Sequence, residues 1–481
     1  MKKIISVMLC VVIALCSFTA VNAFAATPWE NDKQTNKIYW NEKFGDYEFL
    51  QVSAENVCIT KYHGNSENIS VPNKINGYNV TQIGDNAFGS NKTVKKITLP
   101  KGIVEIGLGA FENCENLSYV SIGTSVRKIG FNAFYNTKVY NDKMKSKNIA
   151  YIGKYLVACD SDKYGKKLTV KDGTIGIADN AIMPSIVSSN GKLKTVTLPN
   201  SIRFVGNNAF SDSKNIVNIK LADKLERIGK NAFKGTKFYK NNVKTYSGAK
   251  YIGKYLCEGV SSAKSVKVKN KTTVIADGAF VFGDKGSKIR SITFSSSLKT
   301  IGDEAFENSK YLKSVSVTKN VKYIGSKAFL GCKNLERFKV DKNNKKYLSK
   351  SGVLFDKNKT AVVAYPSSDS STTFSVPNSV KYIEAYAFYG ARNLSSVKLN
   401  NGLVFIGELA FANCSKFDSV TVPNSVRRIC SMAFGAVSDG EKSYKSKKFI
   451  VYGSADSAAK RYCESHEIDN QSYHSPNFVL V

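Results

Sequence analysis

Hydrophobic residues return along this chain at a fixed spacing. Each unit opens with alternating apolar and polar positions, as in Val120-Ser121-Ile122, which predicts a short strand with one buried face. A second extended piece follows, as at 126–129, and an Ala-Phe pair (once Ala-Ile) closes the unit. Six of the eleven gaps between successive pairs are 23 residues. The pairs begin at Ala87, Ala110, Ala133, Ala181, Ala209, Ala232, Ala279, Ala305, Ala328, Ala387, Ala410 and Ala433.

A fixed period of this length is typical of a solenoid, in which each unit buries its apolar face only against its neighbours. We therefore predict a β-rich solenoid of about twelve 23-residue units with short parallel strands. The rings, stacked over twelve turns, are expected to form a continuous aromatic-aliphatic spine. The glycine three residues before most of these pairs, such as Gly130, is expected to supply a turn conformation that is costly for other residues.

The unit has a specific motif, Leu-x-x-Val-x-Leu-Pro-x-Ser-Val-x-x-Ile-Gly-x-x-Ala-Phe. It runs from Leu193 to Phe210 and again from Phe417 to Phe434, where Cys430 replaces the glycine. Over about residues 45–465 the chain resembles the BspA-like (treponemal-type) leucine-rich-repeat family. The resemblance implies a bacterial secreted or surface protein that serves as an adhesin or binds proteins or polysaccharides.

Three interruptions divide the twelve units into four triplets. Two contain the same hexapeptide, at 151–156 and 251–256, in which Gly-Lys between apolar residues predicts a two-residue hairpin turn. The third, at 352–364, predicts a hairpin with a longer turn at 356–358. These hairpins could cover or bend the solenoid, or form binding fingers, and we favour the first role.

The two ends differ from the repeats. Residues 1–25 have the basic start, apolar run and small-x-small site of a secretory signal peptide. We predict an N-terminal cap at 26–80, the solenoid at 81–435, and a C-terminal cap and tail at 436–481. Cap strands are expected at 47–49, 58–60, 69–71 and 449–452, and a short helix at 457–466. The protein is expected to be secreted or noncovalently attached to the cell surface, without a transmembrane segment.

The chain is strongly basic, with a formal net charge of +32. Such a charge favours anionic partners through attraction that salt screens. Most of the basic residues are lysine, which indicates diffuse attraction rather than bidentate recognition. The partner is expected to be a host or microbial surface protein, or an anionic glycan or wall polymer. An extracellular location disfavours nucleic acid, and we expect a monomer.

Eight cysteines lie after the signal peptide. Cys114, Cys332 and Cys414 each follow a repeat phenylalanine by three residues, in a slot that elsewhere holds small side chains. Because coils stack about 4.8 Å apart, cysteines several coils apart cannot form a disulfide. These three are predicted to be buried free thiols. The state of Cys58, Cys159, Cys257, Cys430 and Cys463 is left open.

Catalytic and metal-binding patterns are missing from the repeats. The histidines His63, His466 and His474 lie in or near the caps and have no metal-ligand spacing. We find no nucleophile motif, phosphate-binding loop or cofactor motif. The sequence therefore predicts a noncatalytic protein with no catalytic residue, metal or cofactor.

Two stripes of each unit are expected to face solvent. The strand stripe is rich in hydroxyl groups, weakly basic and free of acids, as expected for a solvated face. The second stripe alternates aromatic and basic residues, which can stack on sugars or attract anions, or can simply cover one another. Its candidate binding residues are Arg127, Lys128, Arg203, Phe204, Arg227, Lys322, Tyr323, Lys381, Tyr382, Phe405, Arg427 and Arg428. The leading function is an adhesin or cell-surface interaction scaffold, and the alternative is a protein that binds polysaccharide or an anionic wall polymer.

Overall fold

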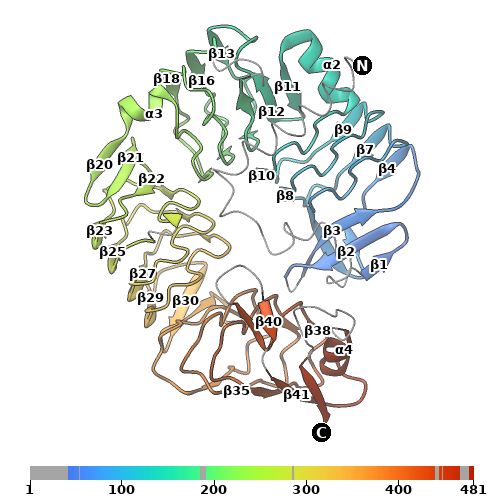
Figure 1. The fold of residues 1–481 in the computed structure, drawn as a ribbon, viewed down its shortest axis with the longest axis vertical. Coiled ribbons are helices and arrows are strands. Elements are labelled where there is room, and N and C mark those ends of the chain that lie inside the picture. The colour runs from blue at the N-terminus through green and yellow to red at the C-terminus, as the bar shows by residue number, and fades with distance from the viewer. Residues whose placement is uncertain are drawn as a thin grey trace.

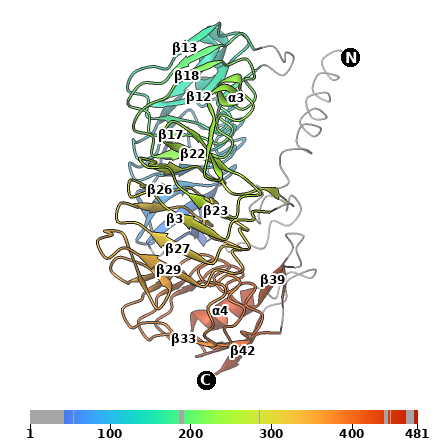
Figure 2. The same cartoon turned by 90° about the vertical axis from the view of Figure 1, so that its left-hand side faces the viewer.

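The coils of this chain are arranged around a centre, so that the solenoid forms a ring (Figure 1). The structure is a computed structural model that describes residues 42–53, 55–184, 191–283, 286–438, 444–446, 448–465 and 476–481. Figure 2 shows the same ring from the side. The predicted signal peptide lies outside the described residues, so the predicted boundary at residue 25 stays a prediction.

Each coil has one strand on the outside of the ring and a shorter strand that faces the centre (Figure 1). The outer strands are β4 (Asn68–Ser70), β7 (Lys96–Thr98), β9 (Tyr119–Ser121), β13 (Lys167–Thr169), β16 (Thr195–Thr197), β18 (Asn218–Lys220), β23 (Ser265–Lys267), β25 (Ser291–Thr293), β27 (Ser314–Val317), β29 (Arg337–Val340), β33 (Thr373–Ser375), β35 (Ser396–Lys398) and β37 (Ser419–Thr421). The inner strands are β6 (Tyr78–Ile83), β8 (Glu105–Ile106), β10 (Lys128–Ile129), β14 (Gly176–Ile177), β17 (Phe204–Val205), β19 (Arg227–Ile228), β24 (Val274–Ile275), β26 (Thr300–Ile301), β28 (Tyr323–Ile324), β34 (Tyr382–Ile383), β36 (Phe405–Ile406) and β38 (Arg428–Ile429).

The predicted parallel β-solenoid is confirmed, with a small difference in the count of turns. Most successive outer strands between two hairpins pair in parallel, as β7 does with β9, and so do the successive inner strands there, as β8 does with β10. The hairpins and caps add turns to the twelve Ala-Phe units, which gives about 17 turns over the described part of the chain.

The phenyl spine exists, but it is interrupted. Rings of successive coils stack within a triplet, for example Phe111 against Phe88 at 5.1 Å and against Phe134 at 5.3 Å between ring centroids. No such stack is found across the hairpins among the described residues. The buried apolar side chains likewise form three large clusters rather than one. The expectation of one unbroken aromatic-aliphatic spine is therefore wrong: the ring stacks end at the hairpins, although the first apolar cluster continues across the first hairpin, from Phe49 to Ala276.

The glycine before the Ala-Phe pair has a different role from the one expected. Gly130 does not have a positive φ. Instead, a Cβ added there would lie only 2.6 Å from Leu108 N of the preceding coil, so the slot needs glycine because two backbones approach closely. The left-handed conformation falls two residues later, at Asn132 (φ 57°). Asparagine adopts this conformation more readily than most residues.

The predicted hairpins are confirmed, and each begins a sheet of the same plan. In every sheet an antiparallel set of strands is followed by three parallel inner strands. The antiparallel sets are β11 (Ile149–Ile152) with β12 (Tyr155–Asp160); β20 (Lys244–Tyr246), β21 (Ala249–Ile252) and β22 (Tyr255–Gly259); and β30 (Tyr347–Lys350), β31 (Val353–Asp356) and β32 (Ala361–Ala364). The pairing of Ile152 with Tyr155 confirms the two-residue turn.

The N-terminal cap is a fourth set of this kind, which the sequence analysis did not anticipate. Strands β1 (Glu42–Phe44), β2 (Tyr47–Gln51) and β3 (Asn56–Tyr62) are antiparallel, and β3 pairs in parallel with the inner strand β6. We call each antiparallel set, with its three following coils, a module. Modules 1 to 4 thus begin at β1, β11, β20 and β30. The ring is built from four similar modules.

The hairpins bend the solenoid. At the start of module 2, β12 pairs with β14, yet the backbone N–H of Asp179 donates to Ile129 O of the preceding module at 2.9 Å. Asp277 makes the same bond to Ile228 O at the start of module 3, also at 2.9 Å. The coils on either side of each of these hairpins are therefore joined by this backbone hydrogen bond, whereas the inserted hairpin strands separate them elsewhere. The bending role that we favoured from the sequence is supported.

The ring closes where module 4 meets module 1. Arg428 of the last inner strand forms an ion pair with Glu42 of β1. The Cys430 thiol donates to the carbonyl oxygen of Gln51 at 3.6 Å. No buried apolar cluster contains described residues from both sides of this seam. The seam is therefore a polar contact, unlike the apolar packing within modules.

The C-terminal cap covers the other edge of the last coil. The predicted strand and helix are confirmed as β41 (Ile450–Gly453) and α4 (Ala458–Ser465), and β42 (Asn477–Leu480) adds a further strand. Tyr462 of α4 packs against Phe434 with ring centroids 5.8 Å apart. The remaining elements are α2 (Lys138–Lys147), α3 (Lys237–Asn242), β5 (Lys74–Ile75), β15 (Ile182–Met183), β39 (Ala436–Ser438) and β40 (Tyr444–Ser446).

All eight cysteines of the described residues are free. In the predicted small slot, the Cys114 and Cys414 thiols each donate to the phenylalanine carbonyl oxygen of the preceding coil at 3.1 Å, and Cys332 does so at 3.3 Å. Ser213 makes the equivalent bond to Ile182 O at 2.9 Å. At these four positions the slot therefore holds a small donor that joins neighbouring coils.

We expect these thiols to be unreactive in the folded protein. Burial raises the pKa of Cys114 to about 11 and that of Cys332 to about 12, which suppresses the nucleophilic thiolate. At neutral pH an aromatic disulfide reagent should modify the partly buried thiol of Cys257 slowly. All eight thiols of the secreted chain should react only after denaturation. Rapid reaction of every thiol without denaturant, or fewer than eight after it, would contradict the fold.

Candidate functional site

The candidate stripe from the sequence maps to the inner strands and the residues just before them. Its members before the strands are accessible: Arg127, Lys322, Lys381 and Arg427 are exposed, and Arg203 is half-buried. Whether these residues bind a ligand stays a prediction.

The members within the strands do not all face solvent. Phe204, Arg227 and Phe405 are buried, which contradicts the expectation that they are exposed. Lys128, Tyr323, Tyr382 and Arg428 are half-buried. The physical reason is that these side chains face the centre of a curved solenoid, where neighbouring coils and modules converge.

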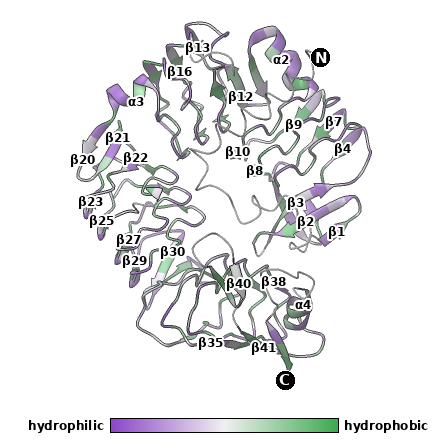
Figure 3. Ribbon diagram, in the orientation of Figure 1, coloured by the Kyte–Doolittle hydropathy of each residue, from purple (hydrophilic) through white to green (hydrophobic). Residues whose placement is uncertain are grey.

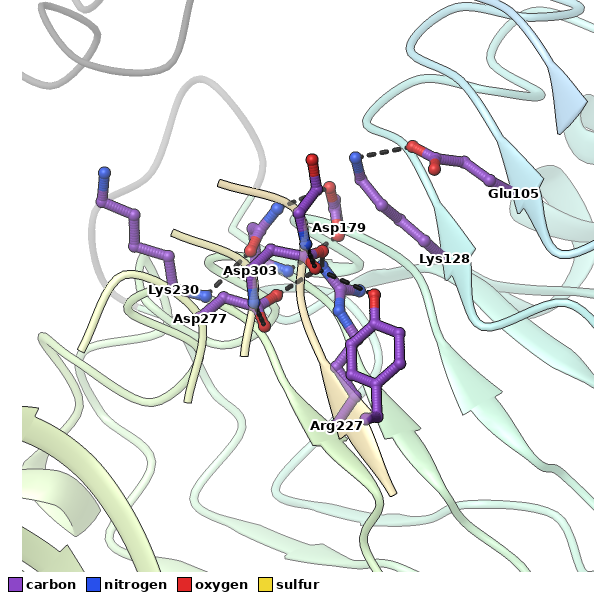
Figure 4. Close-up of polar contacts among 10 residues, drawn as sticks. Glu105, Lys128, Asp179, Arg227, Lys230, Asp277 and Asp303 are labelled. Atoms are coloured by element: carbon purple, nitrogen blue, oxygen red, sulfur yellow. Dashed lines mark hydrogen bonds and ion pairs between the residues drawn. The ribbon is translucent and has the colours of Figure 1, made fainter. Parts of the chain in front are cut away.

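Arg227 is the centre of a polar cluster where modules 2 and 3 meet (Figure 4). Its guanidinium Nη2 lies 2.5 Å from the Oδ2 atom of Asp277 and 3.7 Å from that of Asp303. Arg227 comes from β19, and the two aspartates follow β24 and β26. A charge this well covered is tolerated only with opposite charges beside it. The arginine therefore connects the last coil of one module to the first two coils of the next.

The carboxylates of this region also connect backbones of successive coils. Asp179 Oδ1 accepts the N–H of Asn207 at 2.7 Å, and Asp277 Oδ1 accepts that of Asp303 at 3.0 Å. Asp303 Oδ1 in turn accepts the N–H of Ser326 and the hydroxyl of Tyr323, both at 3.0 Å. Burial raises the pKa of Asp277 to about 7, and the adjacent Arg227 opposes that rise. These side chains are committed to holding the coils together.

A second ion pair lies on the same inner side, in module 1 (Figure 4). Lys128 Nζ is 2.7 Å from Glu105 Oε1 across one coil spacing. Burial works to raise the pKa of Glu105, but the charge and hydrogen bond of Lys128 outweigh it, so the pKa falls below its ordinary value. Lys128 is thus engaged within the ring rather than available as a ligand contact.

The inner cluster offers no chemistry to a substrate. Arg227 is only 7% exposed and Asp277 only 5%, so a solute cannot reach them without opening the junction. Within the described residues no group of histidine, cysteine and acidic side chains could hold a metal ion. His63 instead contacts Glu48 at 2.7 Å, whereas His466 and His474 lie outside the described residues. The arrangement is structural.

Two further inner carboxyls make the stability of module 4 depend on pH. Burial, with Asp356 nearby, raises the pKa of Glu384 to about 7, and burial raises that of Glu408 to about 7 against the charge of Lys327. The folded chain therefore binds more protons than the unfolded chain between about pH 4.5 and pH 7. Their contribution to stability is complete below pH 4.5 and is lost as the pH rises through 7.

Replacing these carboxyls by amides should remove the penalty at high pH. We expect Glu384→Gln and Glu408→Gln each to raise the free energy of unfolding at pH 8 by on the order of 1 kcal/mol, because both groups are only partly covered. At pH 4 neither change should matter. Urea unfolding at both pH values tests this, with exposed Asp172→Asn as the control. A gain at pH 4 equal to that at pH 8 would refute a titration effect.

The outside of the ring has the opposite character. We call the outward side chains of the outer strands, together with the residue before each strand, the outer belt. No acidic residue points outward from the outer strands of the twelve units. Figure 3 shows hydrophilic residues along the outer turns. Exposed Tyr119 lies on the outer belt with Lys96 Nζ 5.2 Å from its ring centroid. The outer belt therefore offers cations, hydroxyls and a tyrosine, and its acids among the described residues are Glu67, Glu336 and Asp418, which precede β4, β29 and β37.

The fold and this repeat geometry define a leucine-rich-repeat solenoid, and the comparisons identify its family. The model of the BspA-type leucine-rich-repeat region matches residues 61–185, 180–284, 281–354 and 358–454. The chain therefore belongs to the BspA-type leucine-rich-repeat proteins. A search of curated proteins found no match. Among the described residues, no helix has the length and apolar character needed to cross a membrane.

Several solved bacterial structures resemble the chain. A leucine-rich cell surface protein of Faecalibacterium prausnitzii is 19% identical, with 85% of this chain and 88% of that chain covered and a TM-score of 0.34. A leucine-rich-repeat protein of Eubacterium ventriosum is 18% identical, with 84% and 93% covered and a TM-score of 0.29. The pneumococcal vaccine antigen PcpA is 16% identical, with 92% and 99% covered and a TM-score of 0.29. The family assignment rests on the repeat model and not on these overlays.

Sequence reasoning missed the residues that hold the modules together. Asp179, Asp277 and Asp303 all occupy the position after an Ile-Ala or Ile-Gly pair. That shared position in the repeat is the sequence signal that could have identified these aspartates. Without knowledge of the ring, however, nothing placed Arg227 beside these aspartates.

Proposed function

We propose that this chain is a noncatalytic extracellular binding protein, an adhesin or surface scaffold whose outer belt engages an anionic partner. The observation that carries the proposal is the separation of charge across the ring. Acidic groups such as Asp277 and Asp303 are held on the inner side, whereas the outward positions of the outer strands carry no acid. At the strand positions an approaching anion therefore meets cations and hydroxyls, whereas the acids of the belt, Glu67, Glu336 and Asp418, lie just before their strands. The membership of a family with surface relatives supports a role at the cell surface.

A second candidate partner, an ordinary surface protein, is favoured by a separate observation. Tyr119, Tyr135, Tyr246 and Tyr311 are each about half exposed, at 52%, 46%, 46% and 48%. Tyrosine is enriched in protein interfaces because it combines apolar area with a polar tip. This feature supports the adhesin form of the proposal.

Binding by the purified secreted chain to a glycan and matrix-protein array tests the proposal. We expect retention at low salt that declines as salt increases, because exposed cations are screened. Salt-resistant binding to particular proteins would favour the tyrosine surface over the charged one. The proposal fails if the protein binds nothing at low salt, or if it cleaves a component of the array.

A further inference from the structure

The cations of the outer belt are not evenly distributed around the ring. Modules 2 and 3 carry at least one exposed cation at most outer strands, from β13 to β29. Representative members are Lys167, Lys194, Lys220, Lys267, Arg290 and Lys339. We call this stretch the cationic arc. In module 4, by contrast, the outward positions are mostly hydroxyls, such as Thr373, Ser396 and Thr421.

Among the described residues, the six representative cations of the arc form no ion pair, whereas Lys313, also on the arc, is paired with Glu336. In module 1, Lys95 Nζ instead lies 2.7 Å from Glu67, and Lys96 lies over the ring of Tyr119. The acidic residue nearest the arc's final strand, Glu336, is already 3.7 Å from Lys313. Unpaired cations without nearby acids are the groups that a polyanion can neutralise.

The geometry of the arc restricts the kind of anion. Its strands pair in parallel in three groups, β13-β16-β18, β23-β25 and β27-β29, and within each group neighbouring coils lie one strand spacing, roughly 5 Å, apart. Its outer surface is convex, which favours a flexible chain over a rigid one. Hydroxyl donors such as Thr195, Ser291 and Thr293 lie among the lysines. Ammonium and hydroxyl groups together suit oxyanions that accept several hydrogen bonds, and lysine binds phosphate as a point charge.

We infer that the cationic arc is a docking surface for a linear phosphodiester polymer, bound along the outer strands of modules 2 and 3. This inference rests on the proposed function and assigns it a surface and a partner chemistry. Each phosphate carries one negative charge, and a flexible polyol backbone allows successive phosphates to follow the convex belt. The exposed members of the second stripe, including Arg127 and Arg427, have no part in this surface.

Two variants with equal charge change test the inference. The arc variant replaces Lys167, Lys194, Lys220, Lys267, Arg290 and Lys339 by glutamine. The control variant replaces six exposed cations elsewhere, which likewise form no ion pair among the described residues: Lys101, Arg127, Lys145, Lys322, Lys381 and Arg427. Each is made in the full secreted chain, and matched thermal unfolding confirms that both are folded. The probe is a fluorescent polyglycerol-phosphate chain, titrated at several salt concentrations, with dextran sulfate in parallel.

The arc variant should bind the phosphodiester chain at least about tenfold more weakly than the unchanged protein, with a shallower salt dependence by roughly 0.7 in log–log slope for each lost contact. The control variant should bind nearly as the unchanged protein does. Equal losses in both variants, or a loss only in the control, would overturn the docking surface. Binding of dextran sulfate without binding of polyglycerol phosphate would overturn the partner chemistry. In these cases array binding by the unchanged protein would still support the proposed function.

Discussion

Replacing Gly229 by alanine should destabilise module 2 by about 3 kcal/mol or more, because the new methyl group would clash with the backbone of the preceding coil. A Cβ at this position would lie 2.3 Å from Asn207 N and 2.4 Å from Gly206 C, both backbone atoms of the preceding coil. Neither can move without breaking the pairing of β17 with β19. Urea unfolding followed by hydrogen exchange of the coil should show the loss.

The matched control is the same substitution at the start of a module. At Gly84 the nearest backbone atom to an added Cβ is Ile59 O at 3.0 Å, and the equivalent positions in modules 2 and 3 already hold Ala178 and Ala276. Gly84→Ala should therefore cost much less than Gly229→Ala. Equal costs at the two sites would show that the hairpins do not loosen the stacking where modules meet.

Replacing Phe411 by alanine should cost about 3–5 kcal/mol, the range for removing a large buried aromatic side chain. Its ring is 2% exposed and stacks at 4.6 Å on Phe388 and at 5.2 Å on Phe434 between centroids. The substitution leaves a cavity that both neighbours border. The free energy of urea unfolding of the full chain measures the effect.

Phe44→Ala provides the comparison, because the Phe44 side chain is 42% exposed in the edge strand β1. Its loss should change the free energy of unfolding by less than about 1 kcal/mol. If Phe411→Ala lowered the free energy of unfolding no more than Phe44→Ala does, the stacked rings would not be a main source of the stability of the coils.

The local fold of each coil could be predicted from the sequence, but the course of the solenoid could not. Ala110-Phe111 and its equivalents mark the coils because each must fill the same interior position. The ring depends instead on how Asp179 and Asp277 reach across a hairpin to Ile129 and Ile228. A bend that depends on a few contacts produces no periodic pattern in the sequence. The similarity of the N-terminal cap to the hairpins was hidden because its turn lacks Gly-Lys.

The candidate site was predictable only in part. Strand alternation indicates to which face of a strand a side chain points, but it does not indicate whether neighbouring coils bury that side chain. Arg127 and Arg427 are exposed as expected, whereas Arg227 occupies the equivalent strand region and is buried against aspartates of the next module. The composition of the outer strands, by contrast, followed from strand alternation alone, because most of their outward side chains are exposed in the described part of the chain.

The central claim is that four modules close into a ring through contact of module 4 with module 1. Spin labels at Lys43→Cys and Arg427→Cys, two exposed positions on opposite sides of the seam, test it directly by pulsed distance measurement. The described native cysteines are buried except for the partly buried Cys257, which is replaced by serine so that the labels attach selectively. A closed ring predicts a short, narrow distance distribution. A long, broad distribution would show an open solenoid and contradict the account.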